Sequence, residues 1–307
     1  MIGRKDVEAA WSLIRPHVRR TPVLELPAGS LGLGSSLALK LESLQVSGTF
    51  KGRGAFHKLL ASKVPPAGII AASGGNHGVA AAYAARALGH KAEIFVPTIS
   101  APAKVARLKG CGAIVHQIGA VYAEARAASE KRAAETGALM VQAYEDPVVF
   151  AGAGSVALEF AEQATFDTLL VAVGGGGLIA GCAAAIGEGI KIVAVETEGT
   201  PTLHEALRAG HPVDVKISGI AADALGASRI GVPNFAVAQK LVRQSVLVSD
   251  EAVATAQRTL WNELHVVAEP AGATGFAALT SGAYRPAPGE RVATLICGAN
   301  TDPGSVA

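Results

Sequence analysis

Short apolar runs alternate with amphipathic segments along most of this chain. The apolar runs predict strands buried on both faces, and a 3.6-residue periodicity between them predicts helices. In the first half, strands are predicted at residues 37–41, 68–72, 92–96, 113–117 and 139–141. Helices are predicted there at residues 6–18, 79–88, 101–109 and 121–136.

The second half repeats this alternation. Strands are predicted at residues 168–173, 191–195, 245–248 and 292–297. Helices are predicted at residues 154–163, 178–186, 201–208 and 250–264. Asp250 is expected to cap the last of these helices, and the Gly- and Pro-punctuated residues 219–233 are expected to form a loop or a broken helix.

Repeated strand–helix units predict the α/β fold class. Because the units fall into two sets along the sequence, we expect two doubly wound open-sheet domains. Open parallel sheets bind ligands at the carboxyl ends of their strands, so the active site is expected in the cleft between the two domains.

Composition and charge exclude several classes of protein. The chain has 307 residues, is 50% hydrophobic, and carries 27 basic and 25 acidic residues for a formal net charge of +2. This balance indicates no nucleic acid or anionic membrane as a partner. The N-terminus has Arg4, Lys5 and Asp6 where a signal peptide needs an apolar core. Three widely spaced cysteines without a Cys-x-x-Cys motif argue against a metal knuckle or a disulfide framework, so a cytoplasmic protein is expected.

Four consecutive glycines, residues 174–177, lie between a predicted strand and a predicted helix. Their backbone amides can turn toward one point, where the helix N-terminus adds positive potential, and this favours a phosphate. A nicotinamide-dinucleotide site is an alternative, because Gly175, Gly177 and Ala180 match Gly-x-Gly-x-x-Ala and Glu196 follows about 20 residues later. A tight strand–helix turn without a ligand is the remaining interpretation.

Lys51 stands between an aromatic residue and several glycines that leave room for another molecule. A lysine in such a site can lose its proton and act as a nucleophile or a base, although a basic turn that opens a helix has the same pattern. Cys297, at the end of the last predicted strand, is a candidate nucleophile, a small buried apolar residue, or a weak hydrogen-bond donor to a ligand nitrogen.

A further cluster, Ser-Gly-Gly-Asn-His-Gly at residues 73–78, precedes a predicted helix. Ser73 is expected to cap that helix, and the amides of the cluster can hold a carboxylate. Asn76 can bind a ring hydroxyl or an oxyanion, whereas His77 is either functional or a polar residue at the helix start.

Six motifs occur in the order found in threonine/serine dehydratases. The chain resembles this family of fold-type II pyridoxal-phosphate enzymes (tryptophan synthase β-like) across nearly its whole length. The motifs are Ser-Gly-Thr-Phe-Lys-Gly-Arg-Gly, Ser-Gly-Gly-Asn-His-Gly, Gly-Gly-Gly-Gly-Leu, Val-Glu at 195–196, Glu-Pro-Ala-Gly-Ala at 269–273 and Cys-Gly-Ala-Asn at 297–300. The dinucleotide alternative explains only one of them.

The resemblance implies a role for each matching position. Lys51 would form the Schiff base with pyridoxal 5'-phosphate and act as the catalytic base, while Phe50 would pack on the cofactor ring. Asn76 would bind the 3'-oxygen of the ring, and Cys297 would lie opposite its pyridine nitrogen. The phosphate would be bound by the backbone of Gly174, Gly175, Gly176, Gly177 and Leu178. The substrate carboxylate would be held by Ser73, Gly74, Asn76 and His77.

The resemblance also implies an organisation and an activity. Residues 1–46 and 147–307 would form a large cofactor-binding domain, residues 47–146 a small domain, and the protein a homodimer. The expected reaction is β-elimination from L-threonine and/or L-serine, which yields a 2-keto acid and ammonia. The alternatives are a dehydratase of a related hydroxy or diamino acid, such as one derived from hydroxyectoine, an NAD-dependent oxidoreductase, and a non-catalytic pyridoxal-phosphate carrier or sensor.

Three departures from the family pattern limit these expectations. Relatives that racemise serine have a serine where this chain has Gly74, so racemase activity is expected to be weak or absent. Metal-activated relatives have an aspartate where this chain has Thr202, six residues after Glu196, so no metal is expected unless Glu198 supplies the missing carboxylate. Because the chain ends soon after Asn300, inhibition by isoleucine through a C-terminal regulatory domain is not expected.

Overall fold

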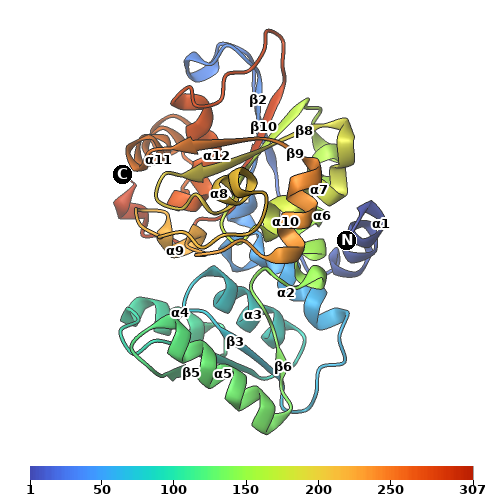
Figure 1. Ribbon diagram of the computed structural model, residues 1–307, viewed down its shortest axis with the longest axis vertical. Coiled ribbons are helices and arrows are strands. Elements are labelled where there is room, and N and C mark those ends of the chain that lie inside the picture. The colour runs from blue at the N-terminus through green and yellow to red at the C-terminus, as the bar shows by residue number, and fades with distance from the viewer. Residues whose placement is uncertain (307) are drawn as a thin grey trace.

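The computed structural model describes residues 1–306, which form two β-sheets with helices on both faces of each (Figure 1). The strands of the larger sheet are β1 (Val23–Leu26), β2 (Leu37–Lys40), β7 (Thr168–Ala172), β8 (Lys191–Thr197), β9 (Val242–Val248) and β10 (Val292–Leu295). Those of the smaller sheet are β3 (Ile69–Ala72), β4 (Ala92–Val96), β5 (Ile114–Gln117) and β6 (Leu139–Met140). The two sheets confirm the predicted α/β fold class.

The larger sheet combines both ends of the chain. Its strand order is β1-β2-β10-β7-β8-β9, with β10 parallel to both β2 and β7. Only β1 runs antiparallel to its neighbour. The smaller sheet, with the order β5-β4-β3-β6, is wholly parallel and is built from the chain between β2 and β7.

Alternate strand residues of the larger sheet face different helical layers. Leu169 and Val171 pack with one layer and Leu170 with the other, so the strands are apolar on both faces. The first layer consists of α1 (Arg4–Ile14), α6 (Pro147–Gln163), α7 (Gly177–Ile186) and α10 (Val232–Leu241). The second consists of α11 (Asp250–Leu264) and α12 (Pro270–Thr280). Short helices α8 (Thr202–Ala209) and α9 (Ala222–Leu225) follow β8.

The smaller sheet has the same arrangement. Ile69 and Ala71 pack toward α2 (Lys51–Leu60), α3 (Asn76–Ala87) and α4 (Pro102–Gly110). Ile70 packs on the opposite side, where α5 (Tyr122–Thr136) lies. In the part of the chain that the structure describes, no helix has the length and apolar character needed to cross a membrane.

Two predicted N-caps were wrong, although the helix predicted at residues 250–264 has the bounds of α11. Ser249, not Asp250, caps α11, since its hydroxyl accepts a hydrogen bond from the N–H of Ala252. Ser73 does not cap α3: the N-cap position is Gly75, and Ser73 Oγ accepts a hydrogen bond from its N–H at 3.3 Å. Helix α3 therefore begins before the predicted residue 79.

Candidate active site

One pocket between the two sheets brings most of the predicted cofactor residues together. Its walls come from the start of α2, the start of α3, the loop between β7 and α7, α9, and the end of β10. The lining residues include Phe50, Lys51, Asn76, Gly174, Gly175, Gly176, Gly177, Leu178 and Cys297. Residues from distant parts of the sequence thus meet at the carboxyl ends of β3, β7 and β10, as expected for open parallel sheets.

Lys51 is the first residue of α2, and its side chain enters this pocket. Its Nζ donates a hydrogen bond to the carbonyl oxygen of Ala143 at 3.2 Å and lies 5.0 Å from the centre of the Phe50 ring. Burial lowers the pKa of Lys51 to about 8, against the opposing influence of Cys297 and Glu269. At neutral pH about a tenth of the molecules therefore carry a neutral, nucleophilic amine at this position.

The glycine run forms a cradle that larger residues would fill. A Cβ atom on Gly175 would overlap the ring of Tyr144, and one on Gly174 would lie 2.9 Å from the backbone of Leu225. Gly176 has a φ of 87°, a left-handed conformation that favours glycine. Helix α7 begins at Gly177, so its N-terminus directs positive potential into the pocket. These features suit a phosphate group.

The Asn76 amide is held by Glu269 and Asn300, which belong to two of the six motifs but to which the sequence analysis assigned no role. Asn76 Nδ2 donates to Glu269 Oε1 at 2.6 Å, and Asn300 Nδ2 donates to Asn76 Oδ1 at 2.6 Å. Asn300 Nδ2 also donates to the carbonyl oxygen of Ser47, which can only accept. Burial raises the pKa of Glu269 to about 7, although its bond from Asn76 favours the ionised form.

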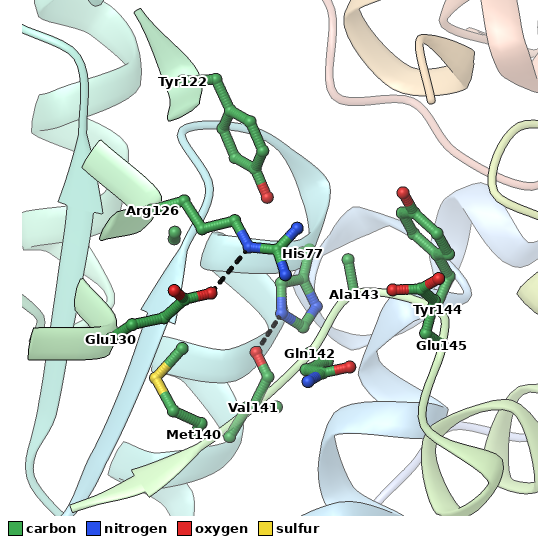
Figure 2. A pocket seen from close by; sticks show the side chains of 11 residues that line it. His77, Tyr122, Arg126, Glu130, Met140, Val141, Gln142, Ala143, Tyr144 and Glu145 are labelled. Atoms are coloured by element: carbon green, nitrogen blue, oxygen red, sulfur yellow. Dashed lines mark hydrogen bonds and ion pairs between the residues drawn. The ribbon is translucent and has the colours of Figure 1, made fainter. Parts of the chain in front are cut away.

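His77 faces a second pocket, adjacent to the first. Figure 2 shows its ring directed toward Val141, with Arg126 beyond it. His77 Nε2 lies 2.8 Å from the carbonyl oxygen of Val141, and burial, helped by Lys51, lowers the pKa of His77 to about 4. The ring is therefore neutral and held by the backbone. Tyr144 lines both pockets.

Cys297 is 3% exposed, and its thiol donates a hydrogen bond to the carbonyl oxygen of Ala271 at 3.4 Å. Burial raises the pKa of this thiol above its usual range. A protonated, buried thiol is a poor nucleophile. Of the alternatives for Cys297, a small neutral group beside the ligand therefore fits best.

Glu196 is not available to bind a ribose. Its Oε1 accepts a hydrogen bond from the N–H of Leu203 and its Oε2 from the N–H of His204, both at 2.7 Å, so the carboxyl group caps α8. It is also fully buried. Among residues 1–306, no group of three or more His, Cys, Asp or Glu side chains is arranged to hold a metal ion.

Comparison with known proteins agrees with this geometry. Residues 14–298 match the family described as pyridoxal-phosphate dependent enzyme. The chain belongs to this family. It is 34% identical to an L-threonine ammonia-lyase of Thermotoga maritima over 308 residues, which cover 98% of this chain and 76% of the relative.

Two solved structures have the same fold. A maize serine racemase matches with a TM-score of 0.94 at 30% identity, covering 99% of this chain and 95% of that chain. A threonine deaminase from T.th. matches with a TM-score of 0.91 at 34% identity, covering 98% of this chain and 99% of that chain. The two-domain fold-type II architecture expected from the motifs is confirmed.

The cofactor of this enzyme is accordingly pyridoxal phosphate. The pocket fits it, because a buried lysine of lowered pKa lies in the same cavity as a glycine cradle at a helix N-terminus. The hypothesis of an NAD-dependent oxidoreductase was wrong. Its physical weakness is Glu196, which is fully buried, caps α8 through both carboxyl oxygens and does not line the pocket.

Proposed function

We propose that this enzyme catalyses β-elimination from L-threonine and/or L-serine, releasing a 2-keto acid and ammonia. The observation that carries the proposal is Lys51, an amine of lowered pKa that lies in one cavity with the glycine cradle. A relative that is 34% identical over nearly the whole chain is an L-threonine ammonia-lyase, which supports the same chemistry here.

Each part of the cofactor has a group to hold it in this pocket. Lys51 would bond the cofactor's aldehyde carbon, and Phe50 would pack on its ring. Asn76 would donate to the ring oxygen, and Cys297 would lie at the pyridine nitrogen. The phosphate would be bound by the backbone amides of Gly174, Gly175, Gly176, Gly177 and Leu178.

Lys51 also supplies the base. Pyridoxal phosphate, when bound, withdraws electrons from the amino acid and stabilises negative charge at Cα. The lowered pKa of Lys51 makes its amine available in the neutral form, which can take the Cα proton. A neutral thiol at Cys297 cannot keep the pyridine nitrogen protonated as an aspartate would. This weakens charge delocalisation and favours prompt loss of the β-hydroxyl.

The turn at the start of α3 would hold the substrate carboxylate. Ser73, Gly74 and Asn76 surround the helix N-terminus, where backbone N–H groups favour an anion. His77 would contribute through its backbone, because its ring is directed toward Val141. Gly74, which has no side chain to act as an acid on the other face of the ring, favours elimination over racemisation.

The two sheets support a division into two domains. We propose a small domain of residues 47–146 and a discontinuous large domain of residues 1–46 and 147–307. In support, β3 to β6 form the smaller sheet and all other strands the larger one. A homodimer in the cytoplasm remains the expected state, and the three cysteines, which are all free, suit a reducing compartment.

A substrate panel tests the proposal. Full-length protein loaded with pyridoxal phosphate is incubated with L-threonine, L-serine, 2,3-diaminopropionate and a hydroxylated diamino acid, and ammonia and keto acid are both measured. We expect fastest release from threonine or serine. Preference for a diamino acid would move the enzyme to the related dehydratases, and no release from any substrate would indicate a cofactor carrier.

A further inference from the structure

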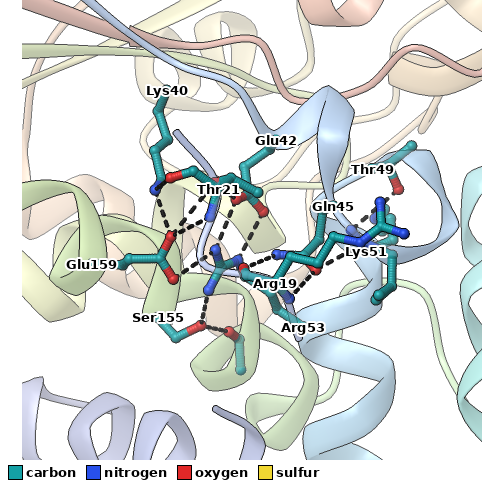
Figure 3. A network of polar contacts seen from close by, with 12 residues as sticks. Arg19, Thr21, Lys40, Glu42, Gln45, Thr49, Lys51, Arg53, Ser155 and Glu159 are labelled. Carbon is teal, nitrogen blue, oxygen red and sulfur yellow. Dashed lines mark hydrogen bonds and ion pairs between the residues drawn. The ribbon is translucent and has the colours of Figure 1, made fainter. Parts of the chain in front are cut away.

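Four fully buried charged side chains lie directly behind the helix turn that carries Lys51. They are Lys40 at the end of β2, Glu42 in the 3₁₀ turn that follows, Arg53 in α2, and Glu159 in α6. Each of these side chains has no exposed surface. Figure 3 shows them converging, with Thr21 between Lys40 and Glu42 and with Ser155 below. We call this group the buried charge cluster.

Arg53 is the centre of the buried charge cluster. Its Nε donates to Glu42 Oε2 and its Nη2 to Glu42 Oε1, both at 2.7 Å, which makes a two-pronged pair. The same Nη2 donates to Glu159 Oε2 at 3.0 Å, and Nη1 donates to Ser155 Oγ at 3.4 Å. The guanidinium group thus joins α2 to both the 3₁₀ turn and α6.

Lys40 completes the cluster from β2. Its Nζ donates to Glu159 Oε1 and to Gln163 Oε1, both at 2.5 Å, and to the carbonyl oxygen of Thr21 at 2.7 Å. All three ammonium protons therefore have acceptors. Burial alone would raise the pKa of Glu42, but Arg53 holds it below its ordinary value, so the carboxylate stays ionised. Two positive and two negative charges balance.

Stability alone is a poor explanation for such a cluster. Removing ions from water is costly, and replacing a buried ion set with well-packed apolar residues is often neutral or stabilising. What the cluster supplies is directional bonding among four chain segments, which apolar contacts do not supply. One of these segments is the first turn of α2, a helix that packs on α6 and on α3 and so bridges the two sheets.

Lys51 and Arg53 are separated by two positions on this helix. Residues at such spacing point in nearly opposite directions. Lys51 points into the cofactor pocket, while Arg53 points into the buried charge cluster. Because the Arg53 guanidinium group is held in the buried charge cluster, the first turn of α2, from which the Lys51 side chain extends, is held as well.

We propose that Arg53 is a positioning residue, which sets the placement of the Lys51 amine in the cofactor pocket by anchoring the first turn of α2 to the buried charge cluster. The inference rests on the proposed role of Lys51 but not on which amino acid the enzyme uses. In this proposal Glu42 and Glu159 are positioning residues as well, because they hold the Arg53 guanidinium group.

The test is Arg53→Met in the full-length chain, with two readouts. The affinity for pyridoxal phosphate is measured by absorbance titration. The pKa of Lys51 is measured in cofactor-free protein by acetylation at a series of pH values followed by mass spectrometry. We expect affinity to fall by about tenfold or more, because small misplacements of catalytic groups have large effects. The Lys51 pKa should rise from about 8 toward that of an ordinary lysine.

Two further variants separate anchoring from stability. The double variant Glu42→Gln/Arg53→Met removes one charge of each sign, so its thermal stability should be higher than that of Arg53→Met. Its Lys51 pKa and its cofactor affinity should stay at the values of Arg53→Met. Arg53→Lys keeps the charge but loses the two-pronged pair, and it should show an intermediate Lys51 pKa even if Arg53→Met does not fold. Leu260→Ala, on the buried face of α11, should lower the stability without touching α2 and should leave both readouts unchanged.

The proposal is overturned if folded Arg53→Met or Arg53→Lys keeps a cofactor affinity within about twofold of that of wild type and a Lys51 pKa within a few tenths of a unit of the wild-type value. Recovery of both readouts together with stability in the double variant would also overturn it, because the cluster would then be only structural. If wild-type protein releases no keto acid, the proposed function fails, yet the Lys51 pKa still decides whether Arg53 positions it.

Discussion

Glu269 Oε1 accepts a hydrogen bond of 2.6 Å from Asn76 Nδ2. This contact joins the start of α12, which packs on the larger sheet, to the start of α3, which packs on the smaller sheet. Asn300 Nδ2, which also donates to the carbonyl oxygen of Ser47, donates to Asn76 Oδ1 and so fixes which end of the Asn76 amide is the nitrogen, whether Glu269 is ionised or protonated. The second N–H of that nitrogen is then free for a ring oxygen. Gly298 belongs to the same arrangement, because a Cβ atom there would overlap the Glu269 carboxyl group.

Glu269→Gln should remove a pH-dependent part of the stability. The pKa of Glu269 is about 7 in the folded protein and 4.5 ordinarily, so the folded chain keeps a proton that the unfolded chain releases. This contribution is fully present below pH 4.5 and is lost as the pH rises to about 7, with a decrease of up to about 3 kcal/mol in the free energy of unfolding. Urea unfolding of cofactor-free protein at pH 5 and pH 8 measures it.

The control for this experiment is Glu263→Gln, which changes an exposed glutamate on α11. Its pH dependence should match that of wild type. If Glu269→Gln also keeps the wild-type slope, Glu269 does not titrate in this range and the argument fails.

Lys51→Ala should abolish turnover while the protein still folds. The side chain supplies both the bond to the cofactor and the base, and loss of a general base alone costs about 10²–10⁴-fold. Ammonia release from L-threonine and the visible absorbance of bound cofactor are the measurements, with circular dichroism as the check on folding. Lys109→Ala, on the exposed side of α4, is the matched control. Residual yellow colour in Lys51→Ala would show that another amine holds the cofactor.

Much of the fold was predictable because buried strands and their helices have distinct periodicities. The smaller sheet was predicted strand by strand, since β3, β4 and β5 are short apolar runs between clear turns. Helices α2 and α12 were not predicted. Helix α2 is a bridge between the two sheets rather than a surface helix with one polar face, and it buries even Arg53. Helix α12 is nearly all apolar and contains two glycines, so it has no amphipathic pattern to detect.

The candidate site was predictable where a motif uses the backbone. Glycines permit a close approach of ligand and chain, so the run at residues 174–177, between a predicted strand and a predicted helix, indicated a candidate phosphate site. The partners of Asn76 were not found, because Glu269 and Asn300 become neighbours of Asn76 only through the pairing of distant segments. Tyr144 was missed for the same reason. It lies after β6 in a segment without regular structure, and only the fold places its ring on Gly175.

Gly175→Ala should weaken cofactor binding through Tyr144. The added Cβ overlaps the Tyr144 ring, so either the ring or the glycine cradle must shift, and overpacking of this kind costs about 1–3 kcal/mol. Absorbance titration with pyridoxal phosphate should show the loss. Tyr144→Ala/Gly175→Ala should regain part of the affinity because the overlap is removed. Gly189→Ala, where a Cβ meets nothing within 4 Å, should behave as wild type.

Gly74→Ser should increase D-serine formation, which we expect to be weak or absent in the wild-type enzyme. A Cβ at Gly74 would lie 3.5 Å from Val96 Cγ1 and 3.8 Å from Ser100 Oγ, which are ordinary contacts, so the new side chain fits without moving the turn. Its hydroxyl would provide an acid on the face of the ring opposite Lys51, and a proton returned to Cα from that face gives the D-enantiomer. Chiral chromatography after incubation with L-serine measures D-serine, and a keto-acid assay measures pyruvate in the same samples. Gly74→Ala, which adds the Cβ without the hydroxyl, should form no D-serine. Wild-type D-serine formation at a rate comparable to that of pyruvate would refute the argument, because Gly74 would then not limit racemisation.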